Sequence, residues 1–136
     1  MPNPRVCPHT KLPLEGLDAI KAIRDGVQAE IAYELTCQDL IPPEQIYTLV
    51  CSKRTLARRV SRGERLSSFE SERLLRLLRV LRYAADSFGD DAKAWSYLGR
   101  PMRRFDGYSC VQMLDTDLGT ALVEELLARI DHGIPG

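Results

Sequence analysis

The sequence predicts an all-α fold, with a helix-turn-helix domain in its N-terminal half and a small helical domain at its C-terminal end. Apolar residues recur every third or fourth position along most of the chain, which is the spacing of amphipathic helices. Serine, threonine and proline residues stand where helices would begin, and glycines stand where helices would end. A short basic helix is predicted directly after a tight turn, which is the helix-turn-helix arrangement.

The chain of 136 residues is long enough for one compact domain or two small ones, and its 44% hydrophobic content is ordinary for a globular protein. The patterns along the chain predict four parts: a proline-rich flexible arm, a helix-turn-helix domain, a long connecting helix that is a candidate homodimer surface, and a C-terminal domain that is expected to bind another protein. Their expected ranges are 1–13, 14–66, 67–88 and 89–136.

Two helices are expected before the turn unit. The apolar residues of the first repeat at every third position: Leu14, Leu17, Ile20 and Ile23. Gly26 follows as the expected C-cap. The second helix takes its apolar residues from Val27 to Leu35 and ends before Ile41.

Pro43 fits the first turn of a third short helix, because its missing N–H costs nothing there. Ile46, Leu49 and Val50 supply the buried side of this helix. Val50 begins the tight turn that ends at Ser52, and it stands where a glycine normally relieves such a turn. We therefore expect strained backbone at Val50, and Ile46 occupies a position that usually holds a small residue.

The stretch from Ser52 to Arg62 is predicted to form an amphipathic basic helix with Ser52 as its N-cap. Leu56, Ala57 and Val60 fall on one side of this helix, and the basic residues fall on the other. This composition is typical of a helix in the DNA major groove, although a core helix with a solvated basic face has the same pattern. The candidate DNA-contacting residues are Ser52, Lys53, Arg54, Thr55, Arg58, Arg59 and Arg62.

These candidates divide into two kinds of contact. The residues expected to reach base edges are Arg54, Thr55 and Arg58. The residues expected to contact phosphates are Lys53, Arg59 and Arg62. The expected site is an inverted repeat that a dimer reads as operator DNA.

Ser67 and Glu70 have the spacing of a capping box, and the helix that they open is the longest in the chain. Its leucines cluster on one side. The arginines of the opposite side are expected to be solvated, with those near the helix start within reach of phosphates: Arg73, Arg76, Arg79 and Arg82.

The last third begins after Gly89 with a short helix around Trp95. A looped section follows, and Thr116 or Asp117 is expected to cap the final helix. Trp95 and Leu114 are assigned to the core. The apolar set of the final helix is Leu118, Leu122, Val123, Leu126, Leu127 and Ile130.

Charge is sorted by position, although the chain as a whole is neutral. From Lys53 to Arg82, ten basic residues stand against three acidic ones, which gives +7. From Phe105 to Gly136, one basic residue stands against six acidic ones, which gives −5. The basic segment suits a phosphate backbone, and the acidic segment suggests a surface that faces another protein or solvent.

No pattern for catalysis or metal binding is recognised. The four cysteines have no CxxC pair, Cys7 and His9 lack partners at ligand spacing, and the only other histidine is His132. We therefore expect no enzyme, no cofactor and no metal. Without a signal segment or a long apolar run, we expect a soluble cytoplasmic protein of a bacterium that does not enter membranes.

Three segments carry a resemblance to a known family. They are Arg54–Arg59, Glu70–Leu77 and, most specifically, the C-terminal series Trp95, Pro101, Gly107, Leu114, Thr116, Gly119, Arg129-Ile130 and Gly133. Together they resemble the antitoxins of the Xre/MbcA/ParS group of bacterial type II toxin–antitoxin systems. The chain departs from the family at Cys110, where proline is usual, at Phe105, where leucine is common, and at Val50.

The resemblance implies an Xre-type helix-turn-helix domain, a C-terminal toxin-binding domain, and a cognate RES-domain toxin that degrades NAD. It also implies that the chain holds this toxin inactive and represses its own operon. We expect the last helix and tail to cover the toxin's substrate site, with Ile130 either in a toxin pocket or on this domain's own core. The candidate toxin-binding residues are Glu125, Arg129, Ile130, His132, Gly133, Ile134, Pro135 and Gly136.

Two other functions remain open from the sequence. One is a stand-alone repressor whose C-terminal domain dimerises or senses a ligand. The other is an adaptor whose degenerate helix-turn-helix no longer binds DNA, because of Ile46 and Val50.

Overall fold

The structure is a computed structural model that describes residues 10–38 and 42–133. Within these ranges the chain is helical, and no strand forms apart from one isolated bridge between Gln28 and Arg65. The elements in order are α1 (Gly16–Asp25), α2 (Ala29–Thr36), α3 (Pro43–Leu49), α4 (Lys53–Ser61), α5 (Ser68–Phe88), α6 (Asp91–Gly99), the 3-10 turns η1 (Arg103–Phe105) and η2 (Gln112–Asp115), and α7 (Asp117–Asp131).

Some expectations fall on residues outside the described ranges. They concern most of the expected N-terminal arm, residues 39–41 directly before Pro42, and three of the candidate toxin-binding residues. The named residues among them are Cys7, His9, Ile41, Ile134, Pro135 and Gly136.

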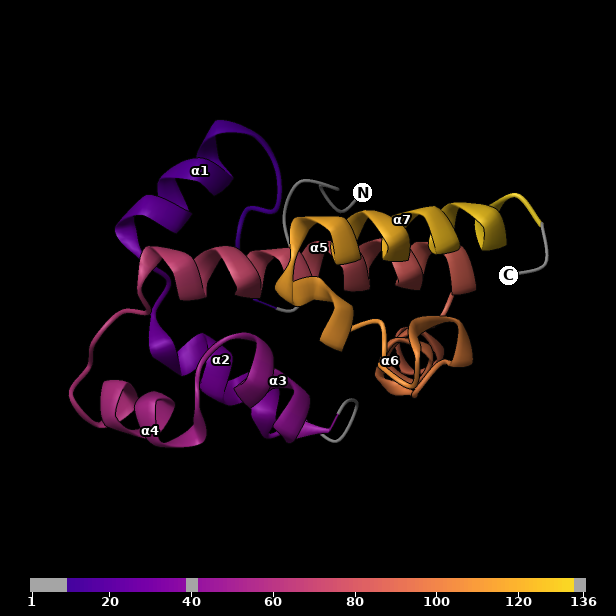
Figure 1. Ribbon diagram of the computed structural model, residues 1–136. Helices are drawn as coiled ribbons and strands as arrows, with labels where there is room; N and C mark the ends of the chain where they lie inside the picture. Colours follow the sequence, from indigo (N-terminus) through magenta and orange to yellow (C-terminus); the bar gives the residue numbers. More distant parts are fainter. Residues whose placement is uncertain (1–9, 39–41, 134–136) are drawn as a thin grey trace.

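The long helix α5 runs through the middle of the molecule (Figure 1). Helices α1 and α7 pack along it, α6 packs against its C-terminal half, and α2, α3 and α4 form a group at its N-terminal end. Its leucines and Val80 are buried, Phe88 is half-buried, and Phe69 and Tyr83 are exposed. Helices α1, α6 and α7 of the same chain pack on α5, and its use as a homodimer surface stays a prediction.

The predicted start and end of α5 are confirmed. The Ser67 hydroxyl accepts a hydrogen bond from the backbone N–H of Glu70, and the Glu70 carboxylate accepts one from the backbone N–H of Ser67. This reciprocal pair is the capping box. Gly89 ends the helix with φ of 71°, a left-handed conformation that favours glycine.

Helix α1 differs from its prediction in the face that it buries. It begins at Gly16, after Leu14, and it packs against α5 through Ala19, while Leu17 and Ile20 are exposed. The spacing of every third residue does not follow one face of an α-helix for long, because three residues cover only about 300°.

Gly26 is the predicted C-cap of α1, and its φ is 88°. A methyl group at Gly26 would overlap the carbonyl oxygen of Leu66, so the close approach of two backbones also requires glycine there. At this crossing the N–H of Leu66 donates to the carbonyl of Val27 at 2.7 Å, and the N–H of Val27 donates to the buried hydroxyl of Ser71. These bonds fasten the α1–α2 connection to the start of α5.

One cluster of buried residues runs through all the segments that the structure describes. It includes Trp95 and Leu114, whose assignment to the core is confirmed. The cluster crosses both positions where the sequence suggests domain boundaries, near Leu66 and near Gly89. In the described ranges, no helix is both long and apolar enough to cross a membrane.

Candidate binding surfaces

The basic helix α4 is held at its start as the sequence predicts. The Ser52 hydroxyl accepts a hydrogen bond from the backbone N–H of Thr55 at 3.1 Å and donates to the Thr55 hydroxyl at 2.9 Å. Helix α4 packs on α2, Leu56 is 2% exposed, and Val60 is half-buried. Ala57 is exposed, so the buried side of α4 is narrower than the projection suggests.

The turn between α3 and α4 is not strained at Val50. This residue has φ of −93° and ψ of −66°, which lie in the right-handed region that any residue adopts. The chain changes direction instead at Ser52, whose backbone is extended with ψ of 156°. The expectation of strain at Val50 is therefore wrong, because this turn needs no left-handed residue. Val50 is buried, and its side chain adds to the core.

Four basic side chains of the α4 region point to solvent, and no acidic residue lies within the helix. They are Lys53, Arg54, Arg58 and Arg62. Of these, Arg62 lies 3.9 Å from the Glu64 carboxylate. The surface therefore offers exposed cations on a fixed helix, which can meet anions without first breaking contacts to the core.

Arg59 behaves differently from the other candidates on α4. Its Nη2 lies 3.1 Å from the Glu70 carboxylate, and its Nη1 lies 3.7 Å from the Glu64 carboxylate. Nη1 also donates to the carbonyl of Arg65 at 3.3 Å, and only 20% of the Arg59 side chain is exposed. This guanidinium fastens the end of α4 to the capping box of α5, so it is engaged inside the protein.

The arginines of α5 are not the solvated row that the sequence suggests. Arg76 is 8% exposed and donates to the carbonyl of Leu114 at 2.8 Å and to the Asp117 carboxylate at 2.6 Å. Asp117 itself is open to solvent on its other sides. The expectation of a solvated Arg76 fails because this side chain pairs with residues some forty positions later instead of with water. The spacing of residues along one helix does not reveal such partners.

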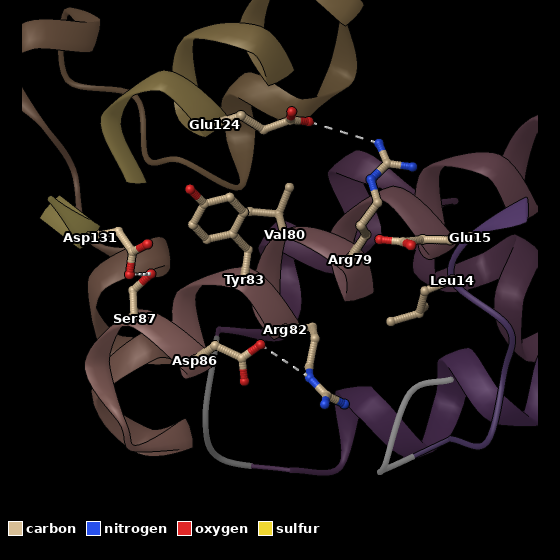
Figure 2. Close-up of a pocket in the computed structure, with 10 residues that line it drawn as sticks. All are labelled: Leu14, Glu15, Arg79, Val80, Arg82, Tyr83, Asp86, Ser87, Glu124 and Asp131. Atoms are coloured by element: carbon tan, nitrogen blue, oxygen red, sulfur yellow. Dashed lines mark hydrogen bonds and ion pairs between the residues drawn. The ribbon is translucent and has the colours of Figure 1, made fainter. Parts of the chain in front are cut away.

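Acidic residues of α7 face α5 at intervals of seven residues, which is two turns of a helix. Asp117 meets Arg76, Glu124 lies 3.9 Å from Arg79, and Asp131 accepts a hydrogen bond from Ser87 at 3.2 Å. Figure 2 shows the last two pairs on the walls of a groove of about 410 Å³ between the two helices. Three of the six acidic residues counted after Phe105 thus contact side chains of α5.

Helix α3 is attached to the C-terminal segment near both of its ends. At its start, the Gln45 side chain donates to the carbonyl of Gly99 at 2.8 Å and accepts from the Ser109 hydroxyl at 2.5 Å. At its end, Arg73 donates to the carbonyl of Leu49 at 3.2 Å and to that of Asp115 at 3.4 Å. The unit that carries the basic helix is therefore packed directly on the last third of the chain.

The start of α7 is capped by Thr116, whose hydroxyl accepts from the backbone N–H of Gly119 at 2.9 Å. A methyl group at Gly119 would overlap the carbonyl oxygen of Met113, so this tight turn accepts only glycine. The Leu-Asp-Thr-Asp-Leu-Gly run of residues 114–119 thus has a structural role. It sets the direction of α7 relative to η2.

The outer face of α7 is exposed and partly apolar. Leu118 is 82% exposed and Leu122 is 47% exposed, so these two members of the apolar set of the final helix do not pack in the core. The core side of α7 is formed by Val123, Leu126 and Leu127, and Leu118 and Leu122 project away from it on a helix of this register.

The described candidate toxin-binding residues are split between two faces of α7. Arg129 and His132 are exposed, and Arg129 lies 3.2 Å from the exposed carboxylate of Glu125 one turn earlier. Ile130 is half-buried and packs against the core, which favours its structural assignment. Gly133 follows the helix with φ of 73°.

Burial raises the pKa of the Cys51 thiol to about 11, and the nearby Glu70 carboxylate adds to this shift. Burial likewise raises the pKa of the Cys110 thiol to about 11. Both thiols are therefore protonated near neutral pH. Among the described residues, no three His, Cys, Asp or Glu side chains gather as metal ligands would.

Some residues that shape these surfaces have no local signal in the sequence. Gln45 and Arg76 act through partners far along the chain, so only the three-dimensional structure assigns them. The heptad spacing of Asp117, Glu124 and Asp131 is a signal that could have placed an acidic stripe opposite arginines of α5.

The C-terminal surfaces lie in a segment with known relatives. Residues 84–133 match the model of a family described as "Antitoxin Xre/MbcA/ParS C-terminal toxin-binding domain". This range includes α6, η1, η2 and α7, and therefore the outer face of α7. The match defines the class of protein as one with a toxin-binding domain and ties the chain to a toxin partner.

Curated relatives extend the similarity beyond this domain. Antitoxin Xre of Pseudomonas putida is 38% identical over 114 residues, which are 82% of this chain and 69% of that protein. Antitoxin Xre of Photorhabdus laumondii is 39% identical over 82 residues, or 60% of this chain and 55% of that protein. Antitoxin Xre of Yersinia enterocolitica is 29% identical over 121 residues, or 88% and 82%. The chain belongs to the Xre antitoxin family.

Proposed function

We propose that this chain neutralises a RES-domain, NAD-degrading toxin by covering its active site, and that it represses its own operon by binding DNA as a dimer. The observation that carries the proposal is the match of residues 84–133 to a toxin-binding domain. The exposed cations of α4 support the DNA-binding part, because they stand on a capped helix with one buried face.

In this proposal the C-terminal segment from Glu125 to Gly136 reaches the mouth of the toxin's substrate site. Arg129 and His132 are exposed at the end of α7 and are free of the core, as contact residues need to be. Ile130 packs on the chain's own core, so we assign the apolar contact with the toxin to Ile134 instead.

Truncation after His132 tests the toxin-binding part. This truncation removes Gly133 to Gly136 and leaves α7 with the bond between Ser87 and Asp131. We expect the truncated chain to fold but to lose inhibition of NAD hydrolysis by the co-expressed RES-domain toxin. The matched control is Leu17→Ala, an exposed site on α1. Full inhibition by the truncated chain would contradict the covering role of the tail.

For DNA, we assign base edges to Arg54, Thr55 and Arg58, and phosphates to Lys53 and Arg62. Ser52 caps the helix, and its backbone lies at the end that would face the groove. We withdraw Arg59 from the phosphate contacts, because two carboxylates and a carbonyl already engage its guanidinium. Its proposed role is to hold α4 at the correct angle.

Substitution of the base-reading residues tests the DNA-binding part. Arg54→Ala or Arg58→Ala is expected to cost about 1–3 kcal/mol for the operator and less for random DNA. Arg24→Ala, at an exposed arginine in the last turn of α1, is the control. Binding isotherms on both DNAs give the two values, and an equal loss on both would reject the base-reading assignment.

A further inference from the structure

Two large apolar side chains on the outer face of α7 are exposed. Leu118 is 82% exposed and Leu122 is 47% exposed. On a helix of about 100° per residue, both fall within an arc of about 80° that also holds Glu125, Arg129 and His132. The two leucines therefore share one face with three residues that the sequence assigns to toxin contact.

The other faces of α7 are already occupied. Val123, Leu126 and Leu127 are buried in the core. The acidic stripe is turned to α5, where Glu124 lies beside Arg79 and Asp131 accepts from Ser87 (Figure 2). The outer face is thus the side of this helix on which a partner can rest without displacing a contact within the chain.

A shallow groove of about 280 Å³ runs beside this face. It is lined from α7 by Leu122, Leu126, Glu125 and Arg129, and from η1 by Arg104 and Phe105. Glu125 and Arg129 are paired with each other at 3.2 Å. Arg104 is exposed on the same wall and makes no ion pair with a described acidic residue. The groove therefore suits a partner that brings apolar side chains and a carboxylate.

We infer that the outer face of α7 docks the toxin, with Leu118 and Leu122 as apolar anchors and Arg104 as the site for a toxin carboxylate. The inference rests on the proposed function and extends it, because it places the main contact upstream of the tail. Among large hydrophobics in the matched range 84–133, those exposed in the described chain are Tyr108, Leu118 and Leu122.

The toxin fits this face better than a second copy of the chain does. The face lies inside the toxin-binding domain and continues, one turn after another, to the tail that is proposed to enter the toxin. Leu17 and Ile20 on α1 are also exposed, and they lie outside that domain. Substitutions at these two residues therefore serve as the control for substitutions on α7.

The experiment measures binding of the double variant Leu118→Glu/Leu122→Glu to the RES-domain toxin co-expressed with the chain. We expect at least a hundredfold loss of affinity, an unchanged circular dichroism spectrum and unchanged operator binding. The control is Leu17→Glu/Ile20→Glu, which adds the same charges to α1 and is expected to bind the toxin like the wild type. Leu118→Ala is the milder second variant in case the double variant fails to fold.

The possible outcomes are distinct. If the wild-type chain does not bind the toxin, the proposed function fails before the inference is reached. If the wild type binds and the Leu118 and Leu122 variants bind equally well, the inference is overturned. If the double variant instead lowers the mass of the free antitoxin in solution, the face joins two copies of the chain, and the inference is also overturned.

Discussion

At the scale of single residues, Arg59 and Arg58 show how far neighbours in one basic run can differ. Both were predicted on the same cationic side of α4. Arg58 is exposed, whereas Arg59 is held by Glu64 and Glu70. The difference arises from where the following loop folds back, and a helical projection of eleven residues contains no information about that loop.

The cysteines give a prediction at the same scale. Because burial raises the pKa of Cys51 and Cys110 to about 11, their reactive thiolate forms are scarce near neutral pH. In a Cys7→Ser background, iodoacetamide at pH 7.5 is expected to alkylate the exposed Cys37 well before the other two thiols. Mass spectrometry of the digested protein measures the order.

The same raised pKa values fix the sign of a pH effect on stability. Folding favours the protonated thiols, so this contribution is complete below the ordinary thiol pKa of 9.0 and is lost as the pH rises towards about 11. Alkylation of Cys51 should increase over the same interval. Rapid labelling of Cys51 and Cys110 at pH 7.5 would contradict both statements.

At the scale of elements, the ends of the helices were predictable and their orientations were not. The caps at Ser52, Ser67 and Thr116 depend on residues within three positions, so the sequence contains the whole interaction. The direction of Leu118 and Leu122 depends on which side of α7 meets α5. The side of α7 that meets α5 is determined by contacts with residues far along the chain, and the sequence of one helix does not reveal these contacts.

Arg76 provides the prediction for how α7 is attached to α5. Arg76→Ala leaves the carbonyl of Leu114 without its donor and Asp117 without its cation. We expect the free energy of unfolding to fall by about 2–3 kcal/mol, as for the loss of hydrogen bonds from a buried, charged side chain. Urea denaturation followed by circular dichroism measures it.

Arg79→Ala is the matched control for this prediction. It removes an arginine three residues later on the same helix, whose contact with Glu124 is longer, at 3.9 Å, and about half exposed on both sides. Its expected cost is below about 1 kcal/mol, as for other surface ion pairs. Equal losses for the two variants would mean that the burial of Arg76 contributes nothing.

At the scale of the whole molecule, some of the sorted charges pair with each other inside the chain. The sequence alone did not distinguish these charges from those available to a partner. The excess of +7 in the middle and the excess of −5 at the end meet in part along the contact of α5 with α7. Within the basic segment, the exposed cations of the α4 region are left over for a partner: Lys53, Arg54, Arg58 and Arg62. The sequence thus located the cationic helix correctly as a segment but attributed too much of the remaining charge to partners.

The continuous core gives a prediction for unfolding. Since one cluster of buried residues joins the expected helix-turn-helix, connecting and C-terminal ranges, we expect a single cooperative thermal transition. Differential scanning calorimetry measures this as agreement between the calorimetric and the van't Hoff enthalpy. Two separate transitions would show that the ranges on either side of residue 67 or residue 89 fold independently.

The attachment of α3 at both ends has a mechanical consequence. Gln45 and Arg73 clamp this helix to the last third of the chain, and α4 follows it after a short turn. A protein bound to α7 and a DNA duplex bound to α4 would therefore be held in a fixed orientation relative to each other. If a large protein on α7 clashed with the duplex, it could not avoid the clash by moving relative to α4. The two ligands would then exclude each other, and one of them would dissociate.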